Sequence, residues 1–232
     1  MREEQDPVAT LTIGVLGGTG DQGRGLAWRF AAAGNPVIIG SRSPERAAHA
    51  AVTVAAEVTE VVGSDCGEVR GMTNHDAAAA ADVVIVAVPW EGHADLLASL
   101  AEVLVGKVVV DCVNPMGFDS HGAFALPVSE GSAAQQAAQL LPGSAVVGAF
   151  HHVSAVLLLD PSVTSVDTDV MVLGDDRRAT DLVQALAARI PGMRGVYAGR
   201  LRNCHQVEAL TANLVSINRR YKGHAGIRVT DI

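Results

Sequence analysis

Residues 11–23 read LTIGVLGGTGDQG, a short apolar run followed at once by four glycines in seven positions. The apolar run is typical of a buried strand, and Gly18, Gly20 and Gly23 match the spacing of a dinucleotide-binding turn. In such a turn the first glycine allows the tight bend, the second lets a pyrophosphate approach the backbone, and the third lets helix and strand pack closely. The unpaired N–H groups of the helix expected at about 22–33 would then face the anion.

The rest of the chain alternates short β-branched runs with longer alanine-rich stretches. This rhythm favours an α/β fold, a doubly wound parallel sheet, because continuous apolar runs suit strands that are covered on both faces. Ser43 and Pro44 predict the start of the second helix as its N-cap and first residue. The expected strands are 11–16, 37–39, 69–72, 82–88, 107–111, 145–149, 170–173 and one near 196, and the expected helices are about 22–33, 44–62, 177–189 and 201–220.

The end of the second expected strand decides between the two nicotinamide cofactors. An NAD enzyme needs a carboxylate there for the ribose 2′-hydroxyl, but this chain has Ser41 and Arg42, with Arg46 one helical turn on. A hydroxyl and two guanidiniums would bind a 2′-phosphate, at about 1.5–3 kcal/mol for each charge-assisted hydrogen bond. The alternative, two solvated arginines at a helix start, is disfavoured because cations are unfavourable at a helix N-terminus. We therefore predict NADP.

Two further motifs follow expected strands at the same edge of the sheet. Pro89-Trp90-Glu91 comes after the fourth strand, and residues 114–117, Asn-Pro-Met-Gly, come after the fifth. Ligands of open α/β sheets lie at this edge. Trp90 is therefore expected either to line the nicotinamide half of the groove or to pack in the core or an interface, and the same alternatives hold for the second motif.

His151 and His152 follow the expected strand at 145–149. Neighbouring residues on an extended chain point to opposite faces, so the pair would make a poor metal site, and we expect one ring at the cleft and the other in the core or at a partner chain. No Cys or carboxylate stands at zinc-like spacing, so we predict no metal. Cys112, in a buried strand, is expected to be inert.

Composition narrows the possible partners. The formal charge of −8 argues against nucleic acid and against an anionic membrane surface. Cys66, Cys112 and Cys204 form no CxxC pair, which favours free thiols in a reducing compartment. The start of the chain is unlike a signal peptide, and no apolar run approaches the roughly 18 residues of a membrane span. We predict a cytoplasmic location.

The strand and helix pattern weakens after residue 151, which predicts a division of the chain into three parts. Residues 1–10, acidic and polar, are expected to form a disordered leader. Residues 11–150 are expected to form the NADP-binding Rossmann domain. Residues 151–232 are expected to form a smaller C-terminal domain bordering a second cofactor site.

Several of these stretches together resemble the NADPH-dependent reductases of coenzyme F420, an 8-hydroxy-5-deazaflavin. The resemblance is carried by residues 17–20, 40–42, 89–91, 150–151 and 174–176, and it extends over nearly the whole chain, from about 11 to 227. It implies an oxidoreductase that moves a hydride reversibly between NADP(H) and coenzyme F420. It also implies that the chain works as a homodimer.

The resemblance assigns residues to the two cofactor sites as well. His151, Val153 and the segment near Ala225 are implied to border the deazaflavin, and the proton that the reduced ring takes up would come from His151 or from a backbone-held water. The sequence departs from the family at His152, which replaces a smaller residue, and at Gly92, which is inserted. The NADP site is implied to comprise Thr19, Gly20, Asp21, Gln22, Ser41, Arg42, Arg46, Trp90, Ala94, Met116 and Ala155.

Other function classes remain open at this point. One is an NADP-dependent reductase of a small carbonyl or imine compound, although Lys107 and Lys222, the two lysines, do not stand where β-hydroxyacid dehydrogenases need theirs. Another is a non-catalytic sensor of the NADPH/NADP ratio. A third is a flavin-linked metalloreductase module, which normally needs a membrane haem partner.

Overall fold

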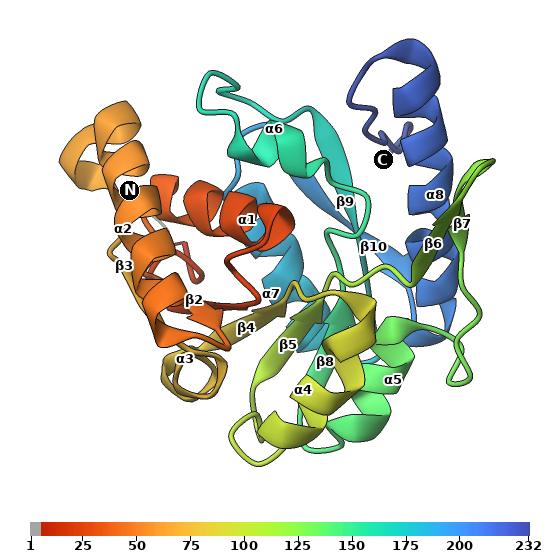
Figure 1. Cartoon of the computed structure of the whole chain (residues 1–232), viewed down its shortest axis with the longest axis horizontal. Helices are drawn as coiled ribbons and strands as arrows, with labels where there is room; N and C mark the ends of the chain where they lie inside the picture. The colour runs from red at the N-terminus through yellow and green to blue at the C-terminus, as the bar shows by residue number, and fades with distance from the viewer. Residues whose placement is uncertain (1–5) are drawn as a thin grey trace.

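The computed structural model describes residues 6–232, and its main sheet has the strand order β3-β2-β1-β4-β5-β8-β9-β10 (Figure 1). The first six strands in this order are parallel, which is the doubly wound arrangement that the sequence predicted. β9 is antiparallel to β8, and β10 is parallel to β9. The strands are β1 Ile13–Leu16, β2 Val37–Ser41, β3 Val69–Thr73, β4 Val83–Val86, β5 Val108–Asp111, β8 Ala145–Gly148, β9 Thr168–Gly174 and β10 Met193–Gly199.

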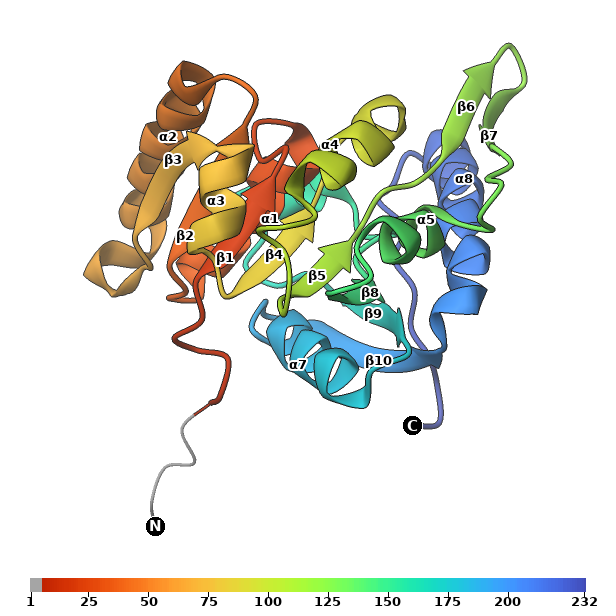
Figure 2. The same cartoon turned by 90° about the horizontal axis from the view of Figure 1, so that it is seen from below.

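Helices cover both faces of this sheet (Figure 2). Alternate residues of a strand point to opposite faces. In β1, Ile13 and Val15 accordingly join the core under α1, α2 and α7, whereas Leu16 joins the core under α3, α4 and α5. The helices are α1 Asp21–Ala32, α2 Pro44–Val62, α3 Asn74–Ala80, α4 His93–Leu100, α5 Ala133–Leu140, α6 Ala155–Leu159, α7 Arg177–Ala188 and α8 Cys204–Tyr221, with 3₁₀ turns at Gly63–Asp65, Trp90–Gly92 and Leu201–Asn203.

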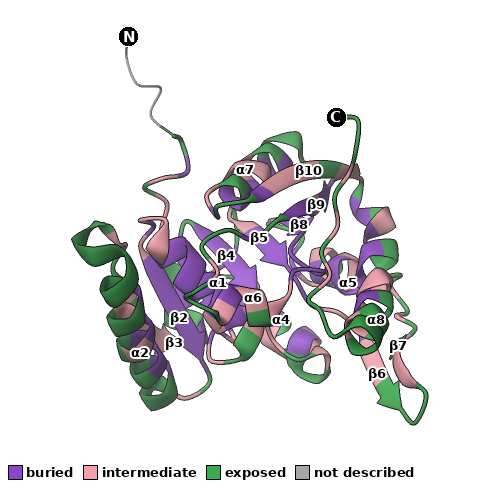
Figure 3. Cartoon of the chain, turned by 90° about the horizontal axis from the view of Figure 1, so that it is seen from above, coloured by how far each residue is buried: buried purple, intermediate pink, exposed green. Residues whose placement is uncertain are grey.

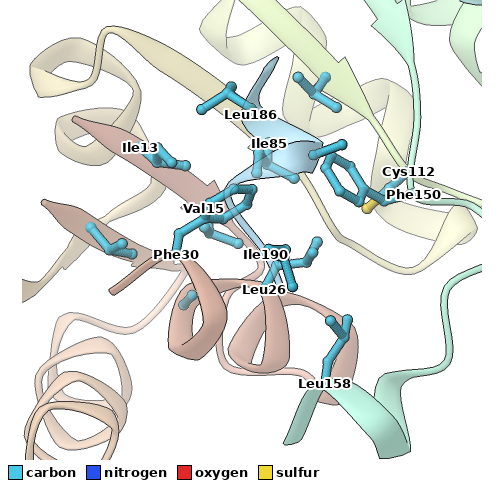
Figure 4. Close-up of a cluster of buried hydrophobic side chains, with 14 of the residues drawn as sticks. Ile13, Val15, Leu26, Phe30, Ile85, Cys112, Phe150, Leu158, Leu186 and Ile190 are labelled. Atoms are coloured by element: carbon cyan, nitrogen blue, oxygen red, sulfur yellow. The ribbon is translucent and has the colours of Figure 1, made fainter. Parts of the chain in front are cut away.

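The core is aliphatic, and β1, β2 and β4 are buried along their whole length (Figure 3). Figure 4 shows the cluster beneath α1, where Leu26 and Phe30 lie against Val15 and Ile85. Phe30 meets Phe150 edge to face, with ring centroids 6.1 Å apart. Each such buried apolar side chain contributes about 1.5–3 kcal/mol. This packing fixes α1 on the sheet and therefore fixes the turn that precedes it.

The sequence pattern predicted the strands of the main sheet and the long helices to within a few residues at each end, and Ser43 caps α2 by accepting a hydrogen bond from Arg46 N at 3.2 Å. It missed the short helices α3 to α6. It also missed a hairpin, β6 Met116–Asp119 and β7 Gly122–Ala125, which packs against α8 (Figure 2). Helices of one or two turns carry too few residues for a periodic signal.

The structure is continuous across the two boundaries that the sequence predicted, after residue 10 and after residue 150. Residues 1–5 of the expected leader lie outside the described residues, while residues 6–10 pack on the domain: Val8 is buried, and Asn35 Nδ2 donates to its carbonyl at 2.8 Å. After residue 150 the main sheet continues through β9 and β10. The division at 150 stays a prediction. Across residues 6–232, no helix is both long and apolar enough to cross a membrane.

The chain after α8, residues 222–232, folds back onto β9, and we call it the C-terminal strap. Asp169 holds it, because this buried carboxylate accepts hydrogen bonds from Arg194 Nη2 at 2.8 Å, Arg228 Nη1 at 2.6 Å and Val229 N at 2.7 Å. The hydrogen bond from Arg194 is the main reason that the pKa of Asp169 lies below its usual range. The carboxylate of Asp169 thus attaches the strap together with the backbone of β9, where Asp169 N donates to Ile227 O at 2.7 Å, and with Thr168, whose Oγ1 accepts from Ile227 N at 3.1 Å.

Asp169→Asn should lower the free energy of unfolding at pH 7 by about 1.5–3 kcal/mol, because a neutral amide removes the anionic partner of Arg194 and one of the two anionic partners of Arg228, which keeps Asp167. Urea denaturation measures this change. The matched control is Asp175→Asn, whose exposed carboxylate contacts Arg200 at 3.5 Å and should contribute little. Equal effects of the two substitutions would contradict the anchoring role.

Candidate functional site

A cleft of about 430 Å³ opens at the carboxyl ends of β1, β4, β5 and β8, with α8 as its far wall. It lies where the strand order reverses, between β1 and β4, which is where open α/β sheets bind ligands. Its lining comes from residues 20–22, 87–89, 112–114 and 151–155, from Thr211, Leu214, Val215 and Asn218 of α8, and from Ala225 of the C-terminal strap.

The glycine turn has the geometry that its spacing predicted. A Cβ at Gly23 would lie 2.8 Å from Gly18 Cα and 2.9 Å from Gly17 O, so no side chain fits between α1 and the turn. Gly20 is exposed, and the nearest atom to a Cβ there is Gly17 O at 3.6 Å. Gly20 therefore leaves the N-terminus of α1 open to an approaching anion, while Gly23 holds the helix close.

The residues predicted to read a 2′-phosphate lie beside this turn. Gly18 N donates to Gly40 O at 3.1 Å, which joins the turn to the end of β2, and Ser41 follows directly. Arg42 and Arg46 are exposed at the start of α2. Within the described part of the chain, no carboxylate lies within 4 Å of either guanidinium. Both charges remain available to a ligand at this edge.

Trp90 packs instead of lining the cleft. Its ring lies 5.5 Å from the ring of His93, and it contacts the core beneath α4. Ala94, in the first turn of α4, and Met116, at the start of β6, are half-buried and also stand outside the lining. Trp90 thus packs partly on the core, and its role toward a cofactor stays a prediction.

The structure thus brings one group of the predicted site residues together and leaves another apart. The cleft contains Gly20, Asp21, Gln22 and Ala155 of the predicted NADP residues, and His151, Val153 and Ala225 of the predicted deazaflavin residues. Outside its lining are Gly18, Thr19, Gly23, Ser41, Arg42, Arg46, Trp90, Ala94 and Met116.

Sequence reasoning missed the wall that α8 supplies. Thr211, Leu214, Val215 and Asn218 follow the spacing i, i+3, i+4, i+7 and so share one face of the helix. The sequence pattern predicted a helix at about 201–220 but assigned none of its residues to a binding site. The loop at 112–114 could have been found from its place after β5, since the carboxyl ends of parallel strands meet at one edge.

The turn after β8 places His151 and His152. Phe150 has a left-handed backbone, φ 62°, which is uncommon for a bulky residue and bends the chain sharply. Its carbonyl accepts a hydrogen bond from Gln22 Nε2 at 3.3 Å, and the carbonyl of His151 accepts one from Asn114 Nδ2 at 2.7 Å. The strained turn is thereby tied to both α1 and the loop after β5.

Both rings of the pair are buried, and burial lowers the pKa of His151 and of His152 to about 4. Both are therefore neutral near pH 7. His152 Nε2 accepts a hydrogen bond from Met171 N of β9 at 3.3 Å. His151 Nε2 lies 3.9 Å from Glu208 Oε1. His152, where this sequence differs from the family it resembles, thus connects the cleft to β9 through its hydrogen bond with Met171.

Behind the cleft lies a buried polar cluster. His93 Nε2 lies 2.6 Å from Asp111 Oδ2 and His93 Nδ1 lies 2.9 Å from Gln136 Oε1, so both ring nitrogens face oxygen atoms, an arrangement that suits the charged imidazolium. Burial opposes this charge, but the hydrogen bond and charge of Asp111 outweigh it and raise the pKa of His93. Glu208 accepts from Ala133 N and Ala134 N at the start of α5, and burial raises its pKa to about 7.

The doubly wound sheet, the glycine turn and the cleft at the strand reversal define a dinucleotide-binding oxidoreductase fold. Residues 12–115 match the family described as NADP oxidoreductase, coenzyme F420-dependent. The chain is 42% identical to the F420-dependent NADP reductase of Methanothermobacter thermautotrophicus over 97% of both chains. It therefore belongs to the family of F420-dependent NADP reductases.

Two further comparisons agree with this assignment. The F420-dependent NADP reductase of Methanocaldococcus jannaschii is 38% identical, over 96% of this chain and 99% of the relative. A crystal structure from Arthrobacter sp. FB24, described as an F420-dependent NADP reductase, superposes with a TM-score of 0.75 at 27% identity. The superposition covers 95% of this chain and 100% of the Arthrobacter chain. The resemblance inferred from the motifs is confirmed, as is the fold class.

Two glycine variants separate folding from ligand binding in the turn. Gly23→Ala should cost about 1–3 kcal/mol of stability, because its methyl group overlaps the backbone of the turn. Gly20→Ala should cost less than about 1 kcal/mol but weaken NADPH binding by about tenfold or more, because its methyl group occupies the open approach to α1. Thermal melts and NADPH titration give the two quantities. Similar loss of stability in both variants would contradict the separate roles.

The His93–Asp111 pair predicts a pH dependence of stability. Because the pKa of His93 is raised, the pair stabilises fully below the unfolded value of about 6.5 and loses this contribution as pH rises through the folded value. His93→Gln should therefore cost about 3 kcal/mol below pH 6.5 or so, and less at higher pH. Urea denaturation across pH tests this, with exposed His121→Gln as control. A cost that grows with pH would refute the charged pair.

Proposed function

We propose that the chain transfers a hydride between the nicotinamide ring of NADP(H) and the deazaflavin ring of coenzyme F420, with both rings in the cleft between the glycine turn and α8. One observation carries the proposal: a single cleft joins residues 20–22 of the dinucleotide turn to Asn218 and Ala225 on the opposite wall. The two cofactors supply the redox chemistry, so the protein's task is proximity and orientation.

The NADP side is built from backbone groups and from two cations. The start of α1 offers the N–H groups of Asp21 and Gln22 to the pyrophosphate, whereas the N–H of Gly20 donates to Gly17 O at 3.0 Å. Ser41, Arg42 and Arg46 lie at the neighbouring strand end, so a dinucleotide with its pyrophosphate on α1 can direct its 2′-phosphate toward them. From the turn the cleft continues past residues 87–89 and 112–114, which lie on the way to the nicotinamide.

The opposite side suits a flat ring of mixed polarity. Leu214 and Val215 offer apolar surface, while Thr211 and Asn218 on the same helix face offer hydrogen bonds. Val153 and the backbone of His151 complete this side. The carbonyl of His151 is held by Asn114 and by Thr211 Oγ1 at 3.1 Å, so the segment that would border the deazaflavin is rigid.

The source of the proton for the reduced deazaflavin follows from the state of His151. A ring with a pKa of about 4 is neutral at pH 7 and is a poor acid, and its side chain is fully buried. These facts favour a water held at the cleft over the imidazole. The homodimer and the cytoplasmic location stay predictions of the sequence.

The absorbance of the oxidised deazaflavin tests the reaction. NADPH should bleach it rapidly, and NADH far more slowly. Bleaching at equal rates would contradict the 2′-phosphate assignment. Tight NADPH binding without bleaching would contradict the proposed reaction, and would favour reduction of a small carbonyl or imine compound, or a sensor of the NADPH/NADP ratio.

Replacement of either arginine should weaken the preference for NADPH over NADH. Arg42→Gln and Arg46→Gln should each raise the KM for NADPH by about tenfold or more, because each removes a charge-assisted hydrogen bond to the 2′-phosphate. The KM for NADH should stay the same in both variants. Arg178→Gln, an exposed arginine on α7, is the matched control and should change neither value. A parallel rise for NADPH and NADH would contradict this role.

A further inference from the structure

The side chain of Glu208 on α8 is buried behind the wall of the cleft, and the proposed reaction makes no use of it. It is the one acidic residue of that helix and is 4% exposed. Its two carboxylate oxygens accept hydrogen bonds from Ala133 N at 2.9 Å and Ala134 N at 3.1 Å. These N–H groups belong to the first turn of α5, where they have no partner within the helix. A carboxylate of α8 therefore caps a helix that begins 75 residues earlier in the chain.

Thr211 stands one turn further along α8 and makes a second contact. It lies three residues after Glu208, and so on the same side of the helix, and its Oγ1 donates to the carbonyl of His151 at 3.1 Å. Thr211 lines the cleft, whereas Glu208 does not. The two side chains thus attach α8 to α5 and to the turn after β8, so the position of the cleft-lining face of α8 depends on Glu208.

Much of the rest of α8 packs against an element that lies apart from the main sheet. The hairpin of β6 and β7 forms a separate two-stranded sheet, and Figure 2 shows it beside α8. Cys204 and Val207, in the first turn of α8, join the core beneath α4 and α5. Beyond that turn, Glu208 and Thr211 connect the helix by hydrogen bonds to the main sheet and the helices that cover it.

Glu208 belongs to the buried polar cluster, and its charge depends on pH near neutrality. Burial is the main reason that its pKa rises to about 7; Asp111 of β5 raises it further, while the two N–H groups of α5 and His93 of α4 lower it. The neutral ring of His151 lies 3.9 Å away. Burial and the charge of Glu208 raise the pKa of the Cys204 thiol on the same helix, which stays neutral. Because a helix start favours a negative charge, the ionised carboxylate is the form that caps α5 best.

We propose that Glu208 is a positioning residue for hydride transfer: by capping α5 it holds α8 at the distance from the glycine turn that brings the deazaflavin ring into contact with the nicotinamide. This inference rests on the proposed function, since it needs the deazaflavin ring on the α8 side of the cleft. Glu208 touches neither ring and acts through Thr211 and its neighbours on the cleft-lining face. NADP, held by α1 and the start of α2 on the opposite side, does not depend on it.

Two substitutions of Glu208 test the proposal. Glu208→Gln keeps the length of the side chain but has no charge and only one oxygen, so it can accept only one of the two hydrogen bonds. Near pH 8 it should raise the KM for the deazaflavin by about tenfold and leave the KM for NADPH unchanged. Glu208→Asp keeps the charge and should raise the KM for the deazaflavin less, although Gln is the closer match in size.

The effect of Glu208→Gln should also depend on pH. Above a pKa of about 7 the ionised carboxylate predominates and the cap is complete, whereas near pH 6 the carboxyl group is mostly protonated and resembles the amide. The ratio of the KM for the deazaflavin in Glu208→Gln to that in the unaltered enzyme should therefore fall from about tenfold near pH 8 toward one near pH 6. Other titrating groups, His93 and Asp111 included, are common to both enzymes and cancel in the ratio.

The matched control is Asp176→Ala, which removes a carboxylate cap from a helix outside the cleft lining. Asp176 Oδ1 accepts a hydrogen bond from Ala179 N at 2.8 Å at the start of α7, and its loss should change neither KM. An equal rise in KM for the deazaflavin and NADPH, no rise for the deazaflavin, or the same ratio at both pH values would overturn the proposal. If Glu208→Gln does not fold, Glu208→Asp takes its place: a rise for the deazaflavin alone supports the proposal, and no rise or an equal rise for NADPH contradicts it.

Failure of the proposed function would be seen separately. If the unaltered chain reduces no deazaflavin, the proposed function fails, and hydrogen exchange then decides whether Glu208 places α8. Near pH 8, faster exchange of the α8 amides in Glu208→Gln than in Asp176→Ala supports the placement, and equal exchange contradicts it.

Discussion

The contact between Gly23 and the backbone of the glycine turn holds α1 against β1, and the rest of the cleft is positioned from there. A Cβ at Gly23 would overlap the turn, so the helix can approach this closely only because glycine has a hydrogen atom where other residues have a Cβ. Because α1 sits so close, Gln22 reaches the carbonyl of Phe150, which ends the strained turn after β8. That turn presents the backbone of His151, which Thr211 of α8 also contacts. Contacts through Gln22, the turn after β8 and Thr211 thus connect the glycine turn to α8, which forms the far wall of the cleft.

Local signals explain which parts of this structure were predictable. The glycine spacing, the β-branched runs and the cap at Ser43 depend on neighbouring residues, and each was found at its predicted place. The 2′-phosphate assignment also uses local information, because Ser41 and Arg42 follow a strand whose parallel neighbour carries the glycines. Four of the five motifs that indicated the family, at residues 17–20, 40–42, 89–91 and 150–151, lie at the carboxyl edge of the parallel strands, where the fold gathers ligand contacts. The fifth, at 174–176, follows β9, which is antiparallel to β8, and lies at the opposite edge.

Features that depend on packing between distant parts of the chain could not be predicted from local sequence signals. Asp169 organises the C-terminal strap through Arg194 and Arg228, which lie 25 and 59 residues further along the chain. The charged state of His93 depends on Asp111 and Gln136, which only the folded sheet and α5 bring to it. The two buried histidines were expected on opposite faces, but Phe150 breaks the extended backbone on which that expectation relied. In the first two cases a partner distant in sequence decides the outcome, and in the third the backbone of the neighbouring Phe150 does.

The central claim is that one cleft holds both rings in contact, so that the hydride passes directly from one to the other. Transfer of isotope tests this most directly: NADPH carrying deuterium at the transferred position of C4 is oxidised by the enzyme with the deazaflavin in ordinary water, and the reduced product is examined by mass spectrometry. The account predicts that the deuterium appears at C5 of the deazaflavin. Its replacement by hydrogen from the solvent would contradict direct transfer within the cleft.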